Sequence, residues 1–262
     1  MKIYDFKRKK NEHSKISMLT CYDYPSACLA AKTDLDVLLI GDSVAMVVHG
    51  HSSTIMATMD MMILHTQAVA RGLGDQFLVV DLPFLCHRGS IDNTLEHVKN
   101  LLQAGAHAIK IEGGDAQVCQ TIRYLVDSGI PVMGHIGLTP QSVLQLGGYK
   151  VQGKDSDQAV QIETQALALE HAGCFAVVVE CVPQKLAKRI TQSLAIPTIG
   201  IGAGVDTDGQ VLVWHDMLGL NTQFNARFVR KFAHTESVFL DGINAYVESV
   251  KQETFPAVEH AF

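Results

Sequence analysis

The sequence has no long apolar run and no excess of positive charge. None of its 262 residues lies in an uninterrupted apolar stretch of about 18 or more, the length that a membrane-spanning helix needs. Its 21 basic residues are outnumbered by 27 acidic ones, which gives a net charge of −6. We therefore expect no membrane span, and the acidic balance argues against nucleic acid as the main partner.

Cysteine is present, but not in the spacing of a metal or redox motif. None of the six cysteines forms a C-x-x-C pair, so neither a zinc ribbon nor a thioredoxin-type motif is expected. Several lie in apolar, strand-like runs, where cysteine behaves as a small hydrophobic residue. No apolar signal segment follows the basic start of the chain. These features favour a reduced, cytoplasmic setting.

The rest of the composition suits a large folded core. Hydrophobic residues make up 47% of the chain and charged residues 18%, which argues against global disorder. Because α/β barrels often reach this length as one domain, we predict a single domain over residues 1–262.

Short apolar runs that end on a polar residue recur along the chain. They are typical of parallel strands buried on both faces, and they lie at residues 37–41, 77–80, 108–111, 131–134, 175–179 and 198–201. Helix-like segments separate the later runs, at residues 92–103, 116–128, 155–172 and 183–193, whereas the earlier helices are less clear. Residues 17–20 and 211–214 bring the strands to eight, which favours a closed (βα)8 TIM barrel over an open sheet.

Three acidic residues, Asp42, Asp81 and Glu112, end successive runs. In a TIM barrel the carboxyl ends of the strands form the active site, and neighbouring strands lie only about 4.8 Å apart. Carboxylates at that spacing repel unless a proton or a cation intervenes. The pattern therefore predicts a site for a hard divalent cation such as Mg²⁺. The alternative is that each acid only caps a strand or binds a helix N-terminus.

Three further polar residues, Lys110, His135 and Glu180, belong to the same set of strands. Lys110 and Glu112 are two apart and should point into the same barrel interior, where Lys110 would meet a substrate carboxylate or, alternatively, form a structural ion pair with Glu112. Glu180 ends an apolar run, an environment that suits a general base for a weak carbon acid. His135 either orients a substrate oxygen or is simply a satisfied polar group.

Two other patterns are weaker. The pair His49-x-His51 could suggest a metal site, but its spacing in a loop favours a structural role. The segment Gly200-x-Gly202-x-Gly204 lacks the full G-x-G-x-x-G spacing of a dinucleotide site. Close approach of backbone at the barrel rim explains these glycines better.

At this point the sequence resembles a known family, the ketopantoate hydroxymethyltransferases. The resemblance covers most of the chain, and its most specific motifs are GHIGLTPQ, GGYKVQG and IGIGAG, at residues 134–141, 147–153 and 199–204. Two departures lie in the loop after the first predicted ligand. Ala45 stands where members usually have Gly, and residues 55–57 read Ile-Met-Ala instead of Leu-Pro-Val. They bear on the conformation of the loop, not on the ligands.

The resemblance implies a decameric (βα)8 barrel of the phosphoenolpyruvate/pyruvate superfamily type. It implies that Mg²⁺ is held by the three acids, that Glu180 is the proton acceptor, and that the substrate contacts are Asp42, Ser43, Asp81, Lys110 and His135. The implied reaction uses 5,10-methylenetetrahydrofolate to add a hydroxymethyl group to 3-methyl-2-oxobutanoate through an enolate. The product would be 2-dehydropantoate, on the route to pantothenate and coenzyme A.

Two rival functions stay open on the sequence alone. One keeps the barrel and the metal but makes or cleaves a C–C bond of a small 2-oxo acid without folate. The other is a catalytically dead oligomer that serves as a scaffold. A scaffold would be expected to have lost at least one of Asp42, Asp81, Lys110, Glu112 and Glu180, and all five are present.

Overall fold

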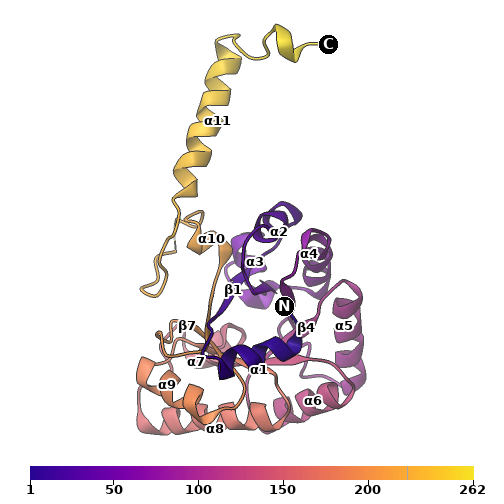
Figure 1. Ribbon diagram of the computed structural model, residues 1–262, viewed down its shortest axis with the longest axis vertical. Coiled ribbons are helices and arrows are strands. Elements are labelled where there is room, and N and C mark those ends of the chain that lie inside the picture. Colours follow the sequence, from indigo (N-terminus) through magenta and orange to yellow (C-terminus); the bar gives the residue numbers. More distant parts are fainter. Residues whose placement is uncertain (223) are drawn as a thin grey trace. The chain divides into compact units, whose positions relative to one another are not determined.

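Eight parallel strands close into a barrel in the order in which they occur in the chain. The computed structural model describes residues 1–222 and 224–262, and it divides into two compact units, Met1–Val213 and Trp214–Phe262. The barrel lies in the first unit (Figure 1). Its strands are β1 (Ile16–Thr20), β2 (Val37–Ile40), β3 (Phe77–Asp81), β4 (Ala108–Glu112), β5 (Val132–Gly137), β6 (Ala176–Glu180), β7 (Thr198–Ile201) and β8 (Gly209–Leu212). The predicted barrel is therefore confirmed, and each predicted strand overlaps an observed one.

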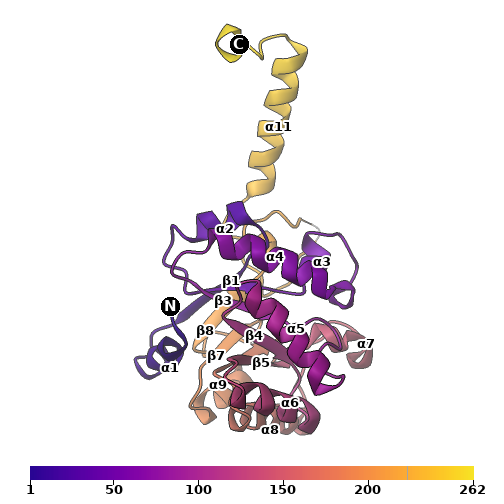
Figure 2. The ribbon, with the colours of Figure 1, turned by 90° about the vertical axis from the view of Figure 1, so that its right-hand side faces the viewer.

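Helices surround the strands, and the four predicted from sequence are all present. They are α5 (Ile91–Gln103), α6 (Ala116–Asp127), α8 (Ser156–His171) and α9 (Gln184–Ser193), and they follow one another around the outside of the barrel in Figure 1. Figure 2 shows the strands at the centre, with α5, α6 and α8 outside them. The first three begin at side chains that accept a backbone N–H at the N-cap, namely Ser90, Asp115 and Asp155.

The early part of the chain is more helical than its sequence pattern indicates. Helices α2 (Tyr24–Ala30) and α4 (Met59–Gly72) pack on each other, and the short α3 (Val44–Val47) and the 3₁₀ turn η1 (Thr54–Met56) lie between β2 and α4. The two family departures fall in this region, with Ala45 buried in α3 and residues 55–57 in and just after η1. A second 3₁₀ turn, η2 (Pro140–Ser142), leads from β5 into α7 (Val143–Leu146).

The interior of the barrel is apolar below its carboxyl-terminal layer. Phe6 of α1 (Ile3–Asn11) belongs to this core, and its ring lies 5.3 Å from that of Phe77 and 4.8 Å from that of Phe175. The core also includes inward-facing residues of the strands, namely Ile16, Met18, Val37, Leu39, Val79, Ala108, Met133, Ala176, Val178, Ile199 and Val211. This packed layer gives the residues above it a rigid, water-free floor.

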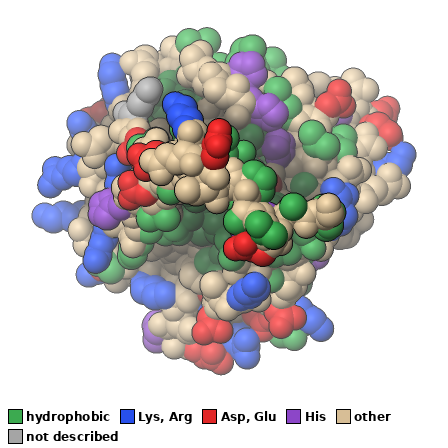
Figure 3. Space-filling model, turned by 90° about the horizontal axis from the view of Figure 1, so that it is seen from above, with side chains coloured by type: hydrophobic (Ala, Val, Ile, Leu, Met, Phe, Trp, Pro, Cys, Tyr) green, Lys and Arg blue, Asp and Glu red, His purple; other side chains and the backbone are tan. Residues whose placement is uncertain are grey.

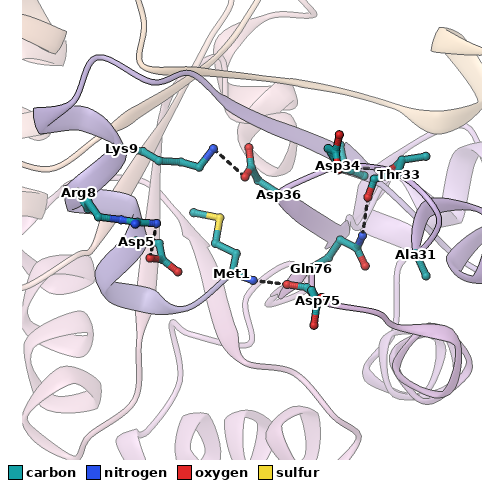
Figure 4. A pocket seen from close by; sticks show the side chains of 11 residues that line it. Met1, Asp5, Arg8, Lys9, Ala31, Thr33, Asp34, Asp36, Asp75 and Gln76 are labelled. Atoms are coloured by element: carbon teal, nitrogen blue, oxygen red, sulfur yellow. Dashed lines mark hydrogen bonds and ion pairs between the residues drawn. The ribbon is translucent and has the colours of Figure 1, made fainter.

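A polar cavity of about 390 Å³ lies beside α1, near the amino ends of β2 and β3. Figure 4 shows two ion pairs among the side chains that line it. Arg8 pairs with Asp5 at 2.7 Å, and Lys9 pairs with Asp36 at 2.8 Å. The first pair lies within α1, and the second joins α1 to the loop before β2.

The second unit contains α10 (Trp214–Met217), α11 (Thr235–Lys251) and the 3₁₀ turn η3 (Val258–His260). No residue of α11 is buried, and its exposed apolar side chains are Val238, Phe239, Leu240, Ile243, Tyr246, Val247 and Val250.

On the face drawn in Figure 3, exposed apolar side chains lie between charged ones of both signs. Across residues 1–222 and 224–262, no helix is long and apolar enough to span a membrane. The prediction of one domain over residues 1–262 stays a prediction.

Candidate active site

Five polar side chains meet at the carboxyl ends of β2 to β5. Each belongs to a strand or follows it closely, and all are buried: Asp42, Asp81, Lys110, Glu112 and His135. The strand register explains the meeting, because Asp81 lies opposite Lys110 and Glu112 lies opposite His135. Glu180 ends β6 opposite Gly137 and is slightly more exposed, with 16% of its side chain accessible. The structure thus brings together the acids, the lysine and the histidine singled out from the sequence.

Lys110 is held by a buried ion pair, but its partner is not the one named in the sequence-based alternative. Its Nζ lies 2.8 Å from Oδ1 of Asp81, rather than beside Glu112. Oδ2 of Asp81 accepts the backbone N–H of Asp42 at 3.1 Å. Burial alone would lower the pKa of Lys110, but the charges of Asp81, Glu112 and Asp42 outweigh it and raise that pKa. Lys110 is therefore a cation fixed among three acids.

His135 links two acids of the site. Its Nδ1 lies 3.3 Å from Oε1 of Glu112, and its Nε2 lies 3.2 Å from Oε2 of Glu180. Burial and the charge of Lys110 would lower its pKa, but the two carboxylates outweigh them and raise it to about 9. Lys110 Nζ also approaches Nδ1 at 3.3 Å. Because both ring nitrogens face carboxylates, we assign the doubly protonated imidazolium at neutral pH.

The acids differ in how well their charges are compensated. The pKa of Asp42 is raised well above its usual range by burial and then by the charges of Asp81 and Glu112. Burial also raises the pKa of Asp81, although Lys110 opposes this. Burial would raise the pKa of Glu112 as well. The hydrogen bond and charge of His135, the charge of Lys110 and the backbone N–H of Gln141 outweigh it and lower that pKa overall. Asp42 is therefore the acid for which a further cation would matter most.

The donor set suits a hard divalent cation. Asp42, Asp81 and Glu112 offer carboxylate oxygens, which Mg²⁺ prefers, and the charges of Asp81 and Glu112 act strongly enough on Asp42 to raise its pKa. Within the part of the chain that the structure describes, however, no three His, Cys, Asp or Glu side chains form a ready ligand shell. Each acid instead bonds to Lys110, Gln141 or His135. The residues fit the group chemically, and the ligand assignment stays a prediction.

Ser43 follows Asp42 and is oriented by a tyrosine that the sequence did not single out. Its Oγ lies 2.7 Å from the hydroxyl of Tyr22, which is buried at 2% exposure. Burial raises the pKa of this tyrosine, so it stays a neutral hydroxyl. Ser43 is thus placed beside the acids, in keeping with its predicted substrate contact.

A glutamine of the GHIGLTPQ motif joins the site as well. Gln141 is buried, and its side-chain amide donates to Oδ2 of Asp42 at 2.9 Å. Its backbone N–H donates to Oε2 of Glu112 at 3.0 Å. In the sequence the motif marks only the family resemblance, because a loop glutamine carries no chemistry that sequence spacing would reveal.

Two weaker sequence patterns have structural explanations. Nε2 of His49 lies 2.9 Å from Nε2 of His65, and Nδ1 of His65 lies 2.5 Å from a backbone carbonyl. His49 is thus joined to a helix residue of α4 rather than to His51. A Cβ at Gly200 or Gly204 would collide with a neighbouring side chain. The interpretation as sites of close approach is therefore confirmed for Gly200 and Gly204.

Comparisons with known proteins point to one family. A model of the family described as ketopantoate hydroxymethyltransferase matches residues 1–258. A protein named 3-methyl-2-oxobutanoate hydroxymethyltransferase from Legionella pneumophila (strain Paris) is 68% identical over 262 residues, with 100% of each chain covered. One of the same name from Francisella tularensis subsp. tularensis (strain WY96-3418) is 50% identical over 260 residues, with 99% of this chain and 98% of the other covered.

Among solved structures, 2,3-dimethylmalate lyase, described as a member of the PEP mutase/isocitrate lyase superfamily, has a similar fold. Its TM-score is 0.60 at 16% identity, with 98% of this chain and 89% of the other covered. At that identity the likeness concerns the fold alone. It confirms the predicted (βα)8-barrel fold.

Proposed function

The chain belongs to the ketopantoate hydroxymethyltransferase family, and from that premise we propose the reaction it performs. It transfers a one-carbon unit from 5,10-methylenetetrahydrofolate to 3-methyl-2-oxobutanoate, giving 2-dehydropantoate for pantothenate and coenzyme A synthesis. One water is consumed, and its oxygen becomes that of the new hydroxymethyl group. The observation that carries the proposal is the buried cluster of Asp42, Asp81, Lys110, Glu112 and His135 beside Glu180, in a chain 68% identical to proteins of that name.

Glu180 is the proposed base. It would take the proton from C3 of the 2-oxo acid, and the electron pair of that C–H bond would form the enolate. Nε2 of His135 lies 3.2 Å from Oε2 of Glu180, so Oε1 would be the oxygen that receives the proton. Glu180 is partly exposed, whereas Asp42, Asp81 and Glu112 are buried. Partial exposure suits a base that must contact the substrate.

The remaining residues hold charge in place. Asp42, Asp81 and Glu112 would hold Mg²⁺, which when bound supplies Lewis-acid stabilisation of the enolate oxygen. Lys110 is a fixed cation among these acids, and it would bind the carboxylate of the substrate. Ser43, oriented by Tyr22 at 2.7 Å, would donate a hydrogen bond to the same substrate. The buried floor of the barrel excludes water beneath them.

The decisive test is exchange of the C3 proton of 3-methyl-2-oxobutanoate in deuterated water, with Mg²⁺ and without folate. Wild-type protein should exchange the proton. Glu180→Gln should not, although substrate binding should persist, because the amide keeps the shape but cannot accept the proton. Normal exchange by Glu180→Gln would remove Glu180 as the base.

Two further measurements test the need for folate and the assignment of the metal ligands. Product formation should need the folate, whereas C–C cleavage or synthesis without it would favour the lyase. Asp81→Asn should raise sharply the Mg²⁺ concentration needed for exchange, because it removes one negative ligand. An unchanged Mg²⁺ requirement would refute the ligand assignment.

The proposal also includes a homo-oligomer and a cytoplasmic location. Seven apolar side chains of α11 are exposed along a helix of 17 residues with no buried residue, a surface that association would cover. Family resemblance suggests ten copies, or ten times 28.5 kDa, about 285 kDa. Sedimentation velocity checks this, and a monomer of 28.5 kDa would refute it. All six cysteines are free thiols, in keeping with a reducing compartment.

A further inference from the structure

Gln141 contacts the carboxyl ends of three other strands. It lies in η2, just beyond β5, and is 5% exposed. Its Nε2 donates to Oδ2 of Asp42 and to the carbonyl oxygen of Leu82, both at 2.9 Å. Its backbone N–H donates to Oε2 of Glu112 at 3.0 Å. One residue therefore bonds directly to two of the three proposed ligands, and to the residue that follows the third.

The segment that carries Gln141 is itself fixed. The backbone N–H of Leu138 donates to the carbonyl oxygen of Glu180 at 2.9 Å, which ties the segment to the end of β6. Gly137 has a φ of +91°, and a Cβ there would overlap the same carbonyl oxygen. The turn continues with a bond from Ser142 N–H to the Thr139 carbonyl at 2.8 Å. Gln141 thus reaches the acids from a restrained backbone rather than from a free loop.

A neutral amide suits this position for a physical reason. Asp42 and Glu112 repel each other, and the charges of Glu112 and Asp81 already raise the pKa of Asp42. A lysine or arginine here would hold the acids but would also neutralise the charge that attracts a divalent cation. A glutamine supplies N–H donors without adding charge. Each acid can therefore be held by one oxygen while the site keeps its negative charge.

We infer that Gln141 is a positioning residue that fixes Asp42 and Glu112 at one spacing and thereby sets the affinity of the site for a divalent cation. This inference rests on the proposed metal site. Residues that orient metal ligands in this way typically change metal affinity by about 10- to 100-fold when they are removed. The backbone donor survives any replacement except proline, so a side-chain substitution removes only the contacts to Asp42 and Leu82.

The test measures binding of Mn²⁺, as a paramagnetic stand-in for Mg²⁺, to the full chain without substrate, from the electron paramagnetic resonance signal of the free ion. Gln141→Met keeps the length of the side chain but removes its donors. Gln161→Met makes the same change at an exposed glutamine of α8 and is the matched control. Gln141→Asn keeps an amide that is one methylene too short to reach Asp42 and serves if the first variant folds poorly.

Both the dissociation constant and the number of sites per chain are measured, because poor folding lowers the number of sites, whereas lost positioning weakens their affinity. Gln141→Met and Gln141→Asn should bind Mn²⁺ about 10- to 100-fold more weakly at an unchanged number of sites, and Gln161→Met should match wild type. If wild type binds Mn²⁺ normally and Gln141→Met binds it with unchanged affinity, the inference is overturned but the proposed metal site is not. A wild-type protein that binds no Mn²⁺ would overturn the proposed metal site, and the inference with it.

Discussion

His87 should make the stability of the protein fall as the pH is lowered. Its side chain is 4% exposed, and neither ring nitrogen has a hydrogen-bond partner within residues 1–222 and 224–262. Burial, helped by the charge of Arg88 and opposed by Glu112 and Asp115, lowers its pKa from 6.5 to about 4. In the unfolded chain the group returns to its ordinary value of about 6.5. Between these values the unfolded chain binds more protons than the folded one.

The sign and the size of the effect follow from that difference. Since the unfolded state takes up the proton first, stability rises with pH across this window and is lost as the pH falls from about 6.5 towards 4. With these two values, lowering the pH from 7 to 5 removes about 2 kcal/mol from the free energy of unfolding. The complete loss, reached below about pH 4, is about 3 kcal/mol.

Urea denaturation at pH 7 and at pH 5 measures this loss, at one protein concentration and followed by circular dichroism. Wild-type protein should lose about 2 kcal/mol more than His87→Gln between the two pH values, because glutamine does not titrate. His171→Gln removes an exposed histidine at the end of α8 and should behave as wild type. Equal losses in wild type and His87→Gln would refute the reasoning.

Three further substitutions test the floor and the ionic layer of the barrel. Lys110→Met should lower the free energy of unfolding in urea by about 3–5 kcal/mol, because it leaves Asp81 buried without its cation; a loss below about 1 kcal/mol would contradict this. Gly137→Ala should lower the melting temperature, since the residue has a φ of +91° and its Cβ would overlap the Glu180 carbonyl; an unchanged melting temperature would argue against that contact. Phe6→Ala should cost about 3–5 kcal/mol in the same urea assay by opening a cavity in the core, and a loss no larger than that of an exposed substitution would show that α1 does not fill the barrel.

The barrel could be predicted because each strand carries its own signal. A continuous apolar run identifies a buried strand wherever it occurs, and the polar residue that ends it marks the carboxyl end. The two-residue period also places Lys110 and Glu112 on one face correctly, since both side chains lie 3.3 Å from Nδ1 of His135. Helix α1 gave no such signal. Its basic residues suggest a surface segment, and only the packing of Phe6 against two other rings shows that it belongs to the core.

The pairing within the site could not be predicted in the same way. Lys110 pairs with Asp81 because the register of β3 and β4 places these residues opposite each other, and register depends on how the whole barrel closes. Gln141 and Tyr22 approach the acids from loops, 99 residues from Asp42 and 21 residues from Ser43. No local pattern encodes contacts of this range. Family resemblance marked the segment of Gln141 without saying what its side chain does.

The balance of charge in the ionic layer explains why one acid stands apart. This ionic layer consists of Asp42, Asp81, Lys110, Glu112, His135 and Glu180. It begins two residues beyond the apolar floor along a strand, as from Val79 to Asp81 and from Val178 to Glu180. Lys110 pairs with Asp81, and protonated His135 is shared by Glu112 and Glu180. Asp42 has no ion-pair partner within the described part of the chain, and its amide contact adds no charge. A divalent cation would supply the positive charge that this layer lacks, and this shortage of positive charge supports the proposed metal site.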